Sequence, residues 1–553
     1  MTSTATSTAA TSNAATSNKN IFERYDIVLP MTRGVIDREL VHLTDIGAIP
    51  SRILLYRTTD ADGDDTYVVA ESAADRPDDV ARIDAVAYPG IDIVEDGTTL
   101  RFVLRFTRGT LHYYYVTGEP PEIVWADADM AGWTYALTVN MDIATVADPD
   151  SEATSDAVRQ QLTDFTDADF RVGKLMLDFT STDLLDYVPD GTAVGEAGSA
   201  ALDVFAAMMK GYLTFVTADP AAHPYILGYS VTASDDSAYP EGITVPLSLE
   251  PCATTFDCKA DKADPDLATL DYLLVTRHGY GKLPSGAPPR VPSKWVSASD
   301  GCDAQMIFRP EILVERLIVE PIFDQIRAVY DAIKHEVNTS RGNDYDAAKK
   351  TTGSGFHFVI SDDKSGKNEY VNEFYVDFKN EGDTAKIVFR DGYIKVFKKK
   401  VKKNACFGVE DAKVDCTYKM KWSGTVALSA SKKDGVPIIE ISEDFEYSDD
   451  QHTNKNDCAK SLDAIADFVG DMTGMFTDIA SQIGLDIDVG ALLDQAIGVA
   501  YPQIGSLGAM VSGLNRTVAT SIILPGGGTY FFKAPRLDAD GTLTLLLTYK
   551  SAT

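Results

Sequence analysis

Alternating apolar and polar residues dominate the first part of the chain and recur between Gly355 and Tyr447. This period of two is typical of strands that bury one face. The Gly-, Asp- and Asn-rich intervals between the runs are too short for crossover helices. The pattern therefore predicts antiparallel meanders, with strands near residues 25–30, 52–57, 66–70, 100–106, 111–116, 133–141, 356–360, 374–378, 386–389 and 425–428.

Two interruptions predict turns. Asp60, Asp62, Asp64 and Glu71 imitate the spacing of a calcium-binding loop, but Asp65 stands where such a loop needs glycine. Because strand-like runs flank this segment, we expect a hairpin turn there. The residues Thr107–Gly109 are likewise expected to form a hairpin-like break between two strands.

Helical spacing is clear in fewer places. Thr32 is expected to cap a helix with Val35, Ile36, Leu40 and Leu43 on one face. Further helices are expected over Ser199–Tyr212, with Ser199 as the cap, and after Pro321.

The longest predicted helix runs from Ser461 to Ile483 and carries a narrow apolar stripe. The glycine-interrupted segment Gly484–Leu514 follows it as broken helices. The stripe is able to face either a solid protein core or a lipid tail, and the pattern leaves both open. Its residues are the candidate ligand-groove residues: Leu462, Ile465, Val469, Met472, Phe476 and Ile479.

Composition and charge then divide the chain. Its 553 residues are too many for one hydrophobic core, and no run approaches 18 consecutive apolar residues, so no transmembrane helix is expected. The net charge of −33 opposes binding to nucleic acid. Residues 341–460 hold 21 basic and 21 acidic side chains, so the whole net charge lies elsewhere. We expect a tail at 1–20, a lobe at 21–340, a β section at 341–460 and a completing segment at 461–553.

The charge-balanced section contains a lysine run. Its candidate contact residues are Lys398, Lys399, Lys400, Lys402 and Lys403. One interpretation is a solvated strand edge, since lysine guards edges against pairing with other chains. The other is a contact for an acidic partner or a lipid headgroup.

No catalytic, metal or cofactor motif is present among the six cysteines and seven histidines. We therefore expect a protein that is not an enzyme; a hydrolase with a dispersed triad is a remote alternative. Cys406 and Cys416 would face each other if a hairpin turned at Asp411, which would allow a disulfide, although free buried thiols are favoured.

The first 18 residues contain no charged side chain and do not resemble a secretory signal. They are expected to form a disordered tail. We expect a protein that is cytoplasmic or released by a non-classical route.

Three segments, in order, resemble the P47 and OrfX accessory proteins encoded beside clostridial neurotoxins. They are the strand-and-helix opening Tyr25–Leu40, the segment Ala268–Thr276 and the Pro-Gly-Gly turn with its Phe-rich strand at Leu524–Lys533. The resemblance implies an α+β, elongated fold of the tubular lipid-binding (TULIP) type, in which strongly curved antiparallel sheets wrap long helices. It implies no catalytic residue.

The resemblance also implies a function. We expect a soluble, non-enzymatic protein that binds a lipid or another long apolar ligand, touches membranes at most peripherally and belongs to a toxin system. The alternative is a structural or interaction protein with the same fold and a filled core, which docks to a toxin or partner subunit.

Overall fold

The computed structural model describes residues 24–59, 62–63, 65–70, 72, 79–146, 152–163, 170–179, 187–218, 224–233, 251–277, 279–282, 294–312, 349–352, 355–364, 368–406, 410–433, 436–456, 522–527 and 529–550. Several expected segments fall outside them, namely the tail 1–20, the helix after Pro321, the helix Ser461–Ile483 and the segment Gly484–Leu514.

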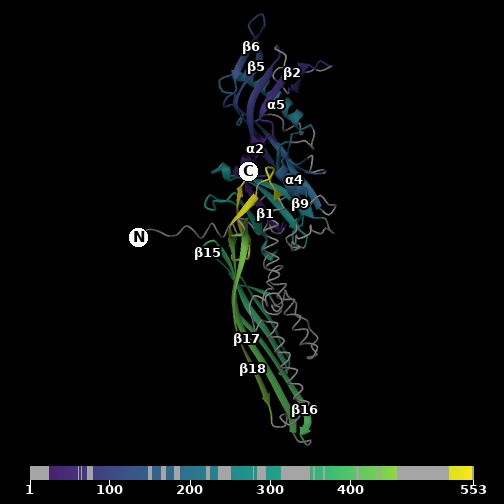
Figure 1. The fold of residues 1–553 in the computed structure, drawn as a ribbon, viewed down its shortest axis with the longest axis vertical. Helices are drawn as coiled ribbons and strands as arrows, with labels where there is room; N and C mark the ends of the chain where they lie inside the picture. Colours follow the sequence, from purple (N-terminus) through teal and green to yellow (C-terminus); the bar gives the residue numbers. More distant parts are fainter. Residues whose placement is uncertain are drawn as a thin grey trace, which may run out of the picture.

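The described part is mostly β, with few helices and three antiparallel sheets along an elongated molecule (Figure 1). The nine-stranded sheet has the order β19-β9-β8-β7-β5-β4-β2-β3, and β6 also pairs with β5. Its strands are β2 (Arg52–Thr59), β3 (Asp65–Val69), β4 (Arg82–Asp92), β5 (Thr99–Thr117), β6 (Glu122–Asp129), β7 (Thr134–Thr145), β8 (Phe170–Asp178), β9 (Ile226–Ala233) and β19 (Ile522–Ile523).

The joining sheet lies in the middle of the molecule and combines segments from both ends of the chain. Its order is β10-β11-β1-β12-β21-β20. The strands are β1 (Ile27–Thr32), β10 (Pro251–Lys259), β11 (Thr269–Thr276), β12 (Ala304–Phe308), β20 (Thr529–Leu537) and β21 (Leu543–Lys550).

The long sheet is a six-stranded meander that reaches the other end of the molecule (Figure 1). It follows chain order through β13 (Lys349–Thr352), β14 (Gly355–Lys364), β15 (Asn368–Glu381), β16 (Thr384–Cys406), β17 (Glu410–Lys433) and β18 (Val436–Lys455). The expected antiparallel meander is confirmed here. One hydrophobic cluster includes Met31, Phe102 and Phe389, so all three sheets share a core.

The helices in the described part of the chain are α2 (Arg33–Asp45), α4 (Asp156–Thr163) and α5 (Gly198–Val216), with a 3-10 turn at Pro265–Leu267. The helix expected after Thr32 is confirmed: Val35, Ile36, Leu40 and Leu43 are buried, although the Thr32 side chain makes no cap hydrogen bond. The helix expected from Ser199 begins at Gly198, with Ala197 as its cap.

The nine-stranded sheet curls around α5. This helix packs against β2, β3 and β5, and its Phe205 meets Trp133 and Tyr135 edge-on at 5.2 and 5.5 Å between ring centroids. Strands β3 and β7 stand four positions apart in the sheet, about 19 Å if it were flat. Because one helix contacts both sides of that span, the sheet must curve.

Helix α5 is long and apolar enough to cross a membrane by length and composition, contrary to the expectation from counting consecutive apolar residues. A core helix passes the same test. About a third of α5 is buried inside the protein. The buried side chains are Ala201, Phe205, Met208, Met209, Tyr212 and Leu213.

The turn expected at Thr107–Gly109 is wrong. β5 runs unbroken for 19 residues, and the register against β4 shifts between Val86 and Ala87. Gly109 has φ +144°, and a Cβ there would lie 2.4 Å from the Ala85 Cα. Thr107 is the extra residue of this β-bulge, while Gly109 pairs with Ala85, so the segment is a bulge rather than a chain reversal. The hairpin expected between Thr59 and Asp65 is confirmed as β2–β3.

The expected geometry of Cys406 and Cys416 is also wrong. β16 ends at Cys406 and β17 begins at Glu410, so Cys406 pairs with Glu410 while Cys416 pairs with Lys398. Eight residues along a strand separate these positions by about 26 Å, far beyond disulfide reach. Cys258 and Cys302 are buried free thiols.

Candidate functional site

The two faces of the long sheet differ in character. One face is apolar and buried, and we call it the apolar face. Its described residues are Phe356, Phe358, Phe374, Val376, Phe378, Ala385, Ile387, Phe389, Ala412, Val414, Met420, Trp422, Val426, Leu428 and Ile439. Alternation along the strands produces this face, since successive side chains point to opposite sides. A register shift between Phe389 and Gly392 interrupts the alternation in β16 and keeps the later even-numbered positions on the same face.

Aromatic rings concentrate at the middle of the apolar face. Phe374 lies 4.8 Å from Phe358 and 5.4 Å from Trp422, and Phe389 lies 5.9 Å from Trp422, between ring centroids. A Cβ on Gly392 would meet the Trp422 ring at 2.3 Å, so the strand needs glycine there. Alternation alone did not predict this contact between Gly392 and Trp422, although an isolated glycine in an alternating run is a signal of close approach.

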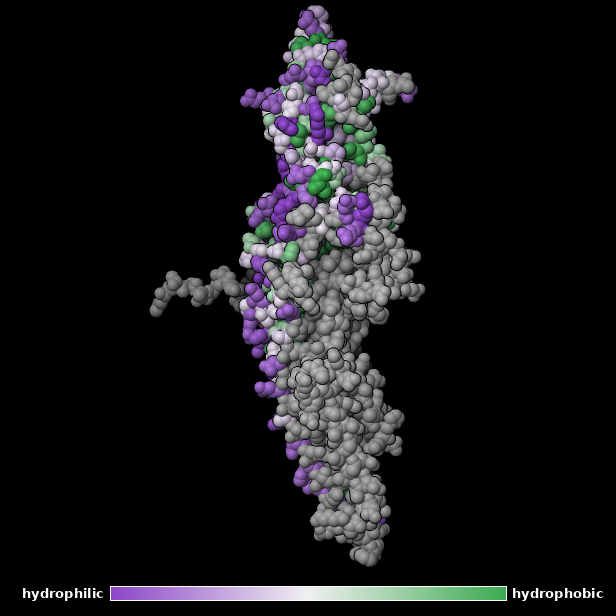
Figure 2. All heavy atoms as spheres, in the orientation of Figure 1, coloured by the Kyte–Doolittle hydropathy of each residue, from purple (hydrophilic) through white to green (hydrophobic). Residues whose placement is uncertain are grey.

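The opposite face is polar and ion-paired. His357 lies 2.7 Å from Glu373 and stacks on Tyr375, and Arg390 binds Asp377 at 2.6 Å. The edge strand β18 exposes further acids at Glu440, Asp444, Glu446 and Asp450. Figure 2 shows a row of hydrophilic residues along the long sheet.

The lysine run lies on β16 toward the far end of the long sheet (Figure 1). Register places Lys398, Lys400 and Lys402 opposite Cys416, Val414 and Ala412. Val414 and Ala412 belong to the apolar face, whereas Lys399 and Lys403 are exposed. A period of two thus puts three lysine positions on the apolar face and two on the polar face.

The other candidate residues, Leu462, Ile465, Val469, Met472, Phe476 and Ile479, lie outside the described residues. Their role as ligand-groove residues therefore stays a prediction.

Within the described residues, no nucleophile, histidine and acid lie together as a catalytic triad. His112 lies 2.6 Å from Asp127 and stacks on Trp125, which resembles half of a triad. No serine or cysteine of the described part hydrogen-bonds its ring or that of His357. In the same ranges, no group of three His, Cys, Asp or Glu residues is placed to hold a metal ion.

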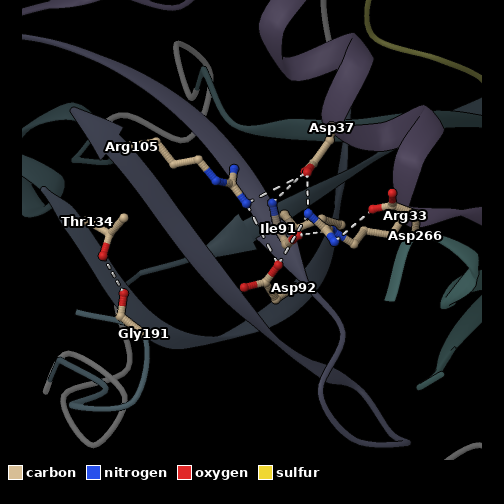
Figure 3. A network of polar contacts seen from close by, with 8 residues as sticks. All are labelled: Arg33, Asp37, Ile91, Asp92, Arg105, Thr134, Gly191 and Asp266. Atoms are coloured by element: carbon tan, nitrogen blue, oxygen red, sulfur yellow. Dashed lines mark hydrogen bonds and ion pairs between the residues drawn. The ribbon is translucent and has the colours of Figure 1, made fainter. Parts of the chain in front are cut away.

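A polar network joins α2 to the nine-stranded sheet (Figure 3). Arg33 binds Asp37 at 2.9 Å, Asp266 at 3.0 Å and Asp92 at 3.4 Å, and donates to the Ile91 carbonyl at 2.7 Å. Burial alone would lower the pKa of Arg33, but the three acids raise it. Burial raises the pKa of Asp37 despite the Arg33 charge. Since these contacts satisfy one another, the network is a structural joint.

The three segments that carry the family resemblance meet at the joining sheet. β1 pairs with β11, which spans most of Ala268–Thr276. The Gly526 amide of the Pro-Gly-Gly turn donates to the buried Glu39 carboxylate of α2 at 2.9 Å. These residues hold the fold together.

The structure is similar to P47 from Clostridium botulinum A2, with 12% identity, coverage of 96% of this chain and 98% of that chain, and a TM-score of 0.42. It is similar to P47 of Clostridium botulinum E1, with 9% identity, 95% and 98% coverage and a TM-score of 0.41. It also matches lipopolysaccharide binding protein, with 10% identity, 96% and 100% coverage and a TM-score of 0.27.

The resemblance expected from the sequence is thus matched by a structural similarity at low sequence identity. No family model matches the sequence, and no curated protein does.

Proposed function

We propose that this protein binds a lipid or another long apolar ligand and does not act as an enzyme. The supporting observation is the succession of residues on one face of β16. Toward the middle of the molecule this face carries the buried Ala385, Ile387 and Phe389. Toward the far end, the same face carries the positions of Lys398, Lys400 and Lys402.

Such a succession suits an amphiphile with an anionic head. Burial of an acyl chain contributes about 0.8 kcal/mol per methylene, so a chain of ordinary length supplies most of the affinity. The lysines attract the head locally although the whole chain carries a net charge of −33. The stretch of β16 from the buried Phe389 to Lys402 is 13 residues long, which corresponds to about 43 Å along the strand.

The proposal includes a more detailed fold than the described residues define. In it, curved sheets of the TULIP type wrap the predicted helix Ser461–Ile483, and the stripe Leu462–Ile479 faces the ligand. A role beside a toxin is implied by the resemblance alone and stays a prediction.

Two sets of substitutions on one strand test the headgroup role. The triple variant Lys398→Gln, Lys400→Gln, Lys402→Gln removes the lysines on the apolar face. The control Lys399→Gln, Lys403→Gln removes exposed lysines from the other face of the same strand. The probes are a fluorescent long-chain fatty acid and the matching uncharged alcohol, titrated by fluorescence.

The triple variant is expected to bind the fatty acid at least about tenfold more weakly, which corresponds to one charge-assisted contact. Its binding of the alcohol, and both affinities of the control, should change less than about twofold. Equal losses in the two variants would reject a headgroup site on the apolar face.

A further inference from the structure

The β5–β6 hairpin extends beyond the rest of the nine-stranded sheet. β4 pairs with β5 only as far as His112, whereas β6 follows β5 to the pair Thr117–Glu122. The hairpin lies at the end of the molecule opposite the lysine run (Figure 1). We call residues 113–126 the end ribbon. Its base is tied down by Arg57, whose guanidinium donates to the Tyr114 hydroxyl and lies over the Tyr114 ring.

The end ribbon exposes large apolar side chains. Ile123 is 66% exposed, Val116 60%, Trp125 40% and Tyr115 37%. These are four of the ten large apolar side chains that are exposed in the described part of the chain, gathered in one short hairpin. Figure 2 shows hydrophobic surface at this end of the molecule. A soluble surface gains nothing from such a cluster, which therefore points to an interaction.

The exposed residues lie on both faces of the end ribbon. Val116 pairs directly with Ile123, and Trp125 lies two residues beyond Ile123 on the same strand, so these three share one face. Tyr115 is the neighbour of Val116 along the strand and points to the opposite face. A protein partner that packs on a two-stranded ribbon covers one face, whereas immersion in a bilayer covers both.

Charge decides which surface fits. The ribbon with its turn contains Glu119 and Glu122 and no lysine or arginine. Acidic groups oppose an anionic lipid surface but not a zwitterionic one. Tyrosine and tryptophan are the residues that favour the bilayer interface, where an apolar ring and a polar tip are both accommodated.

We propose that the tip of the end ribbon inserts into the interface of a zwitterionic lipid bilayer. This inference rests on the proposed function and deepens it, because a protein that binds lipid must collect it from a lipid surface. The ribbon would hold the molecule end-on at that surface, with the lysine run at the far end.

The full-length protein is tested by flotation with phosphatidylcholine vesicles. Val116→Asp with Ile123→Asp is the ribbon variant. The control is Val41→Asp in α2 with Ile46→Asp directly after that helix, since those residues are 38% and 50% exposed. The wild type and the control should float equally, in a manner insensitive to salt, and the ribbon variant should bind at least about tenfold more weakly. Matching thermal melts establish that both variants fold.

Trp125 gives a second readout. Vesicles of brominated phosphatidylcholine should quench part of the tryptophan fluorescence, and Trp125→Phe should abolish that part. The inference is overturned by three results: no flotation of the wild type, flotation only with anionic vesicles, or equal binding of ribbon variant and control.

Failure of the proposed function has a different signature. If the protein co-purifies with lipid but does not bind vesicles, membrane insertion by the end ribbon is refuted and the proposed lipid binding stands. If it binds vesicles through the end ribbon but never carries lipid, the proposed lipid binding is refuted and the insertion stands.

Discussion

Asp271 of β11 is fully buried, and neither carboxylate oxygen has a hydrogen-bond partner in the described part of the chain. Burial raises its pKa to about 8, and the negative charge of Asp257, directly across the ladder, adds to the shift. The folded protein therefore holds this proton more tightly than the unfolded chain, whose aspartate pKa is about 4. Stability should be greatest below pH 4 for this group and should decline as pH rises through 8.

Asp271→Asn should remove this decline, because the amide has nearly the same shape and no titratable proton. We expect the variant to be more stable than the wild type at pH 8.5, by several degrees in Tm, and similar to it near pH 4.5. Thermal unfolding followed across this pH range measures the difference. An unchanged pH slope in the variant would show that Asp271 is ionised in the fold.

Particular residues also show which features the sequence pattern predicts and which it does not. Alternation predicted strands at 374–378 and 425–428, which lie within β15 and β17, because a period of two needs no tertiary information. Thr107–Gly109 was misread, since glycine in a strand pattern fits both a turn and a bulge. What distinguishes them is Ala85 of β4 against Gly109, a contact between residues 24 positions apart.

Helix α2 is held in place by contacts that its own sequence does not predict. Its apolar stripe and its start after Thr32 were predictable from helical periodicity. The partners of Arg33 were not, because Asp92 and Asp266 lie far along the chain. The same holds for the lysine run, whose division between two faces follows from the register of β16 on β17.

Replacing Arg33 by glutamine should destabilise the protein by about 2–3 kcal/mol, because three acids would lose a mostly buried cation. The matched control is Arg38→Gln on the same helix, whose side chain is 53% exposed and pairs with Asp303. An exposed pair contributes less than about 1 kcal/mol. Denaturant titration of both variants compares them, and equal losses would contradict a buried joint at α2.

On the scale of the whole molecule, the antiparallel β character was predictable and the assembly of the sheets was not. β1 lies between β11 and β12, and the C-terminal β20 and β21 complete the same joining sheet. Such pairings bring together segments hundreds of residues apart, and alternation alone does not choose among them. The segments that carried the resemblance lie in this sheet, which explains why they indicated the fold rather than a binding site.

We propose that the molecule holds an apolar ligand against the long sheet. The first experiment is native mass spectrometry of the purified chain, beside organic extraction and mass spectrometry of the same sample. We predict a reproducible, stoichiometric lipid whose mass equals the difference between the native and denatured species. A clean apo mass that persists after incubation with mixed lipids would contradict the claim and favour a scaffold with a filled core.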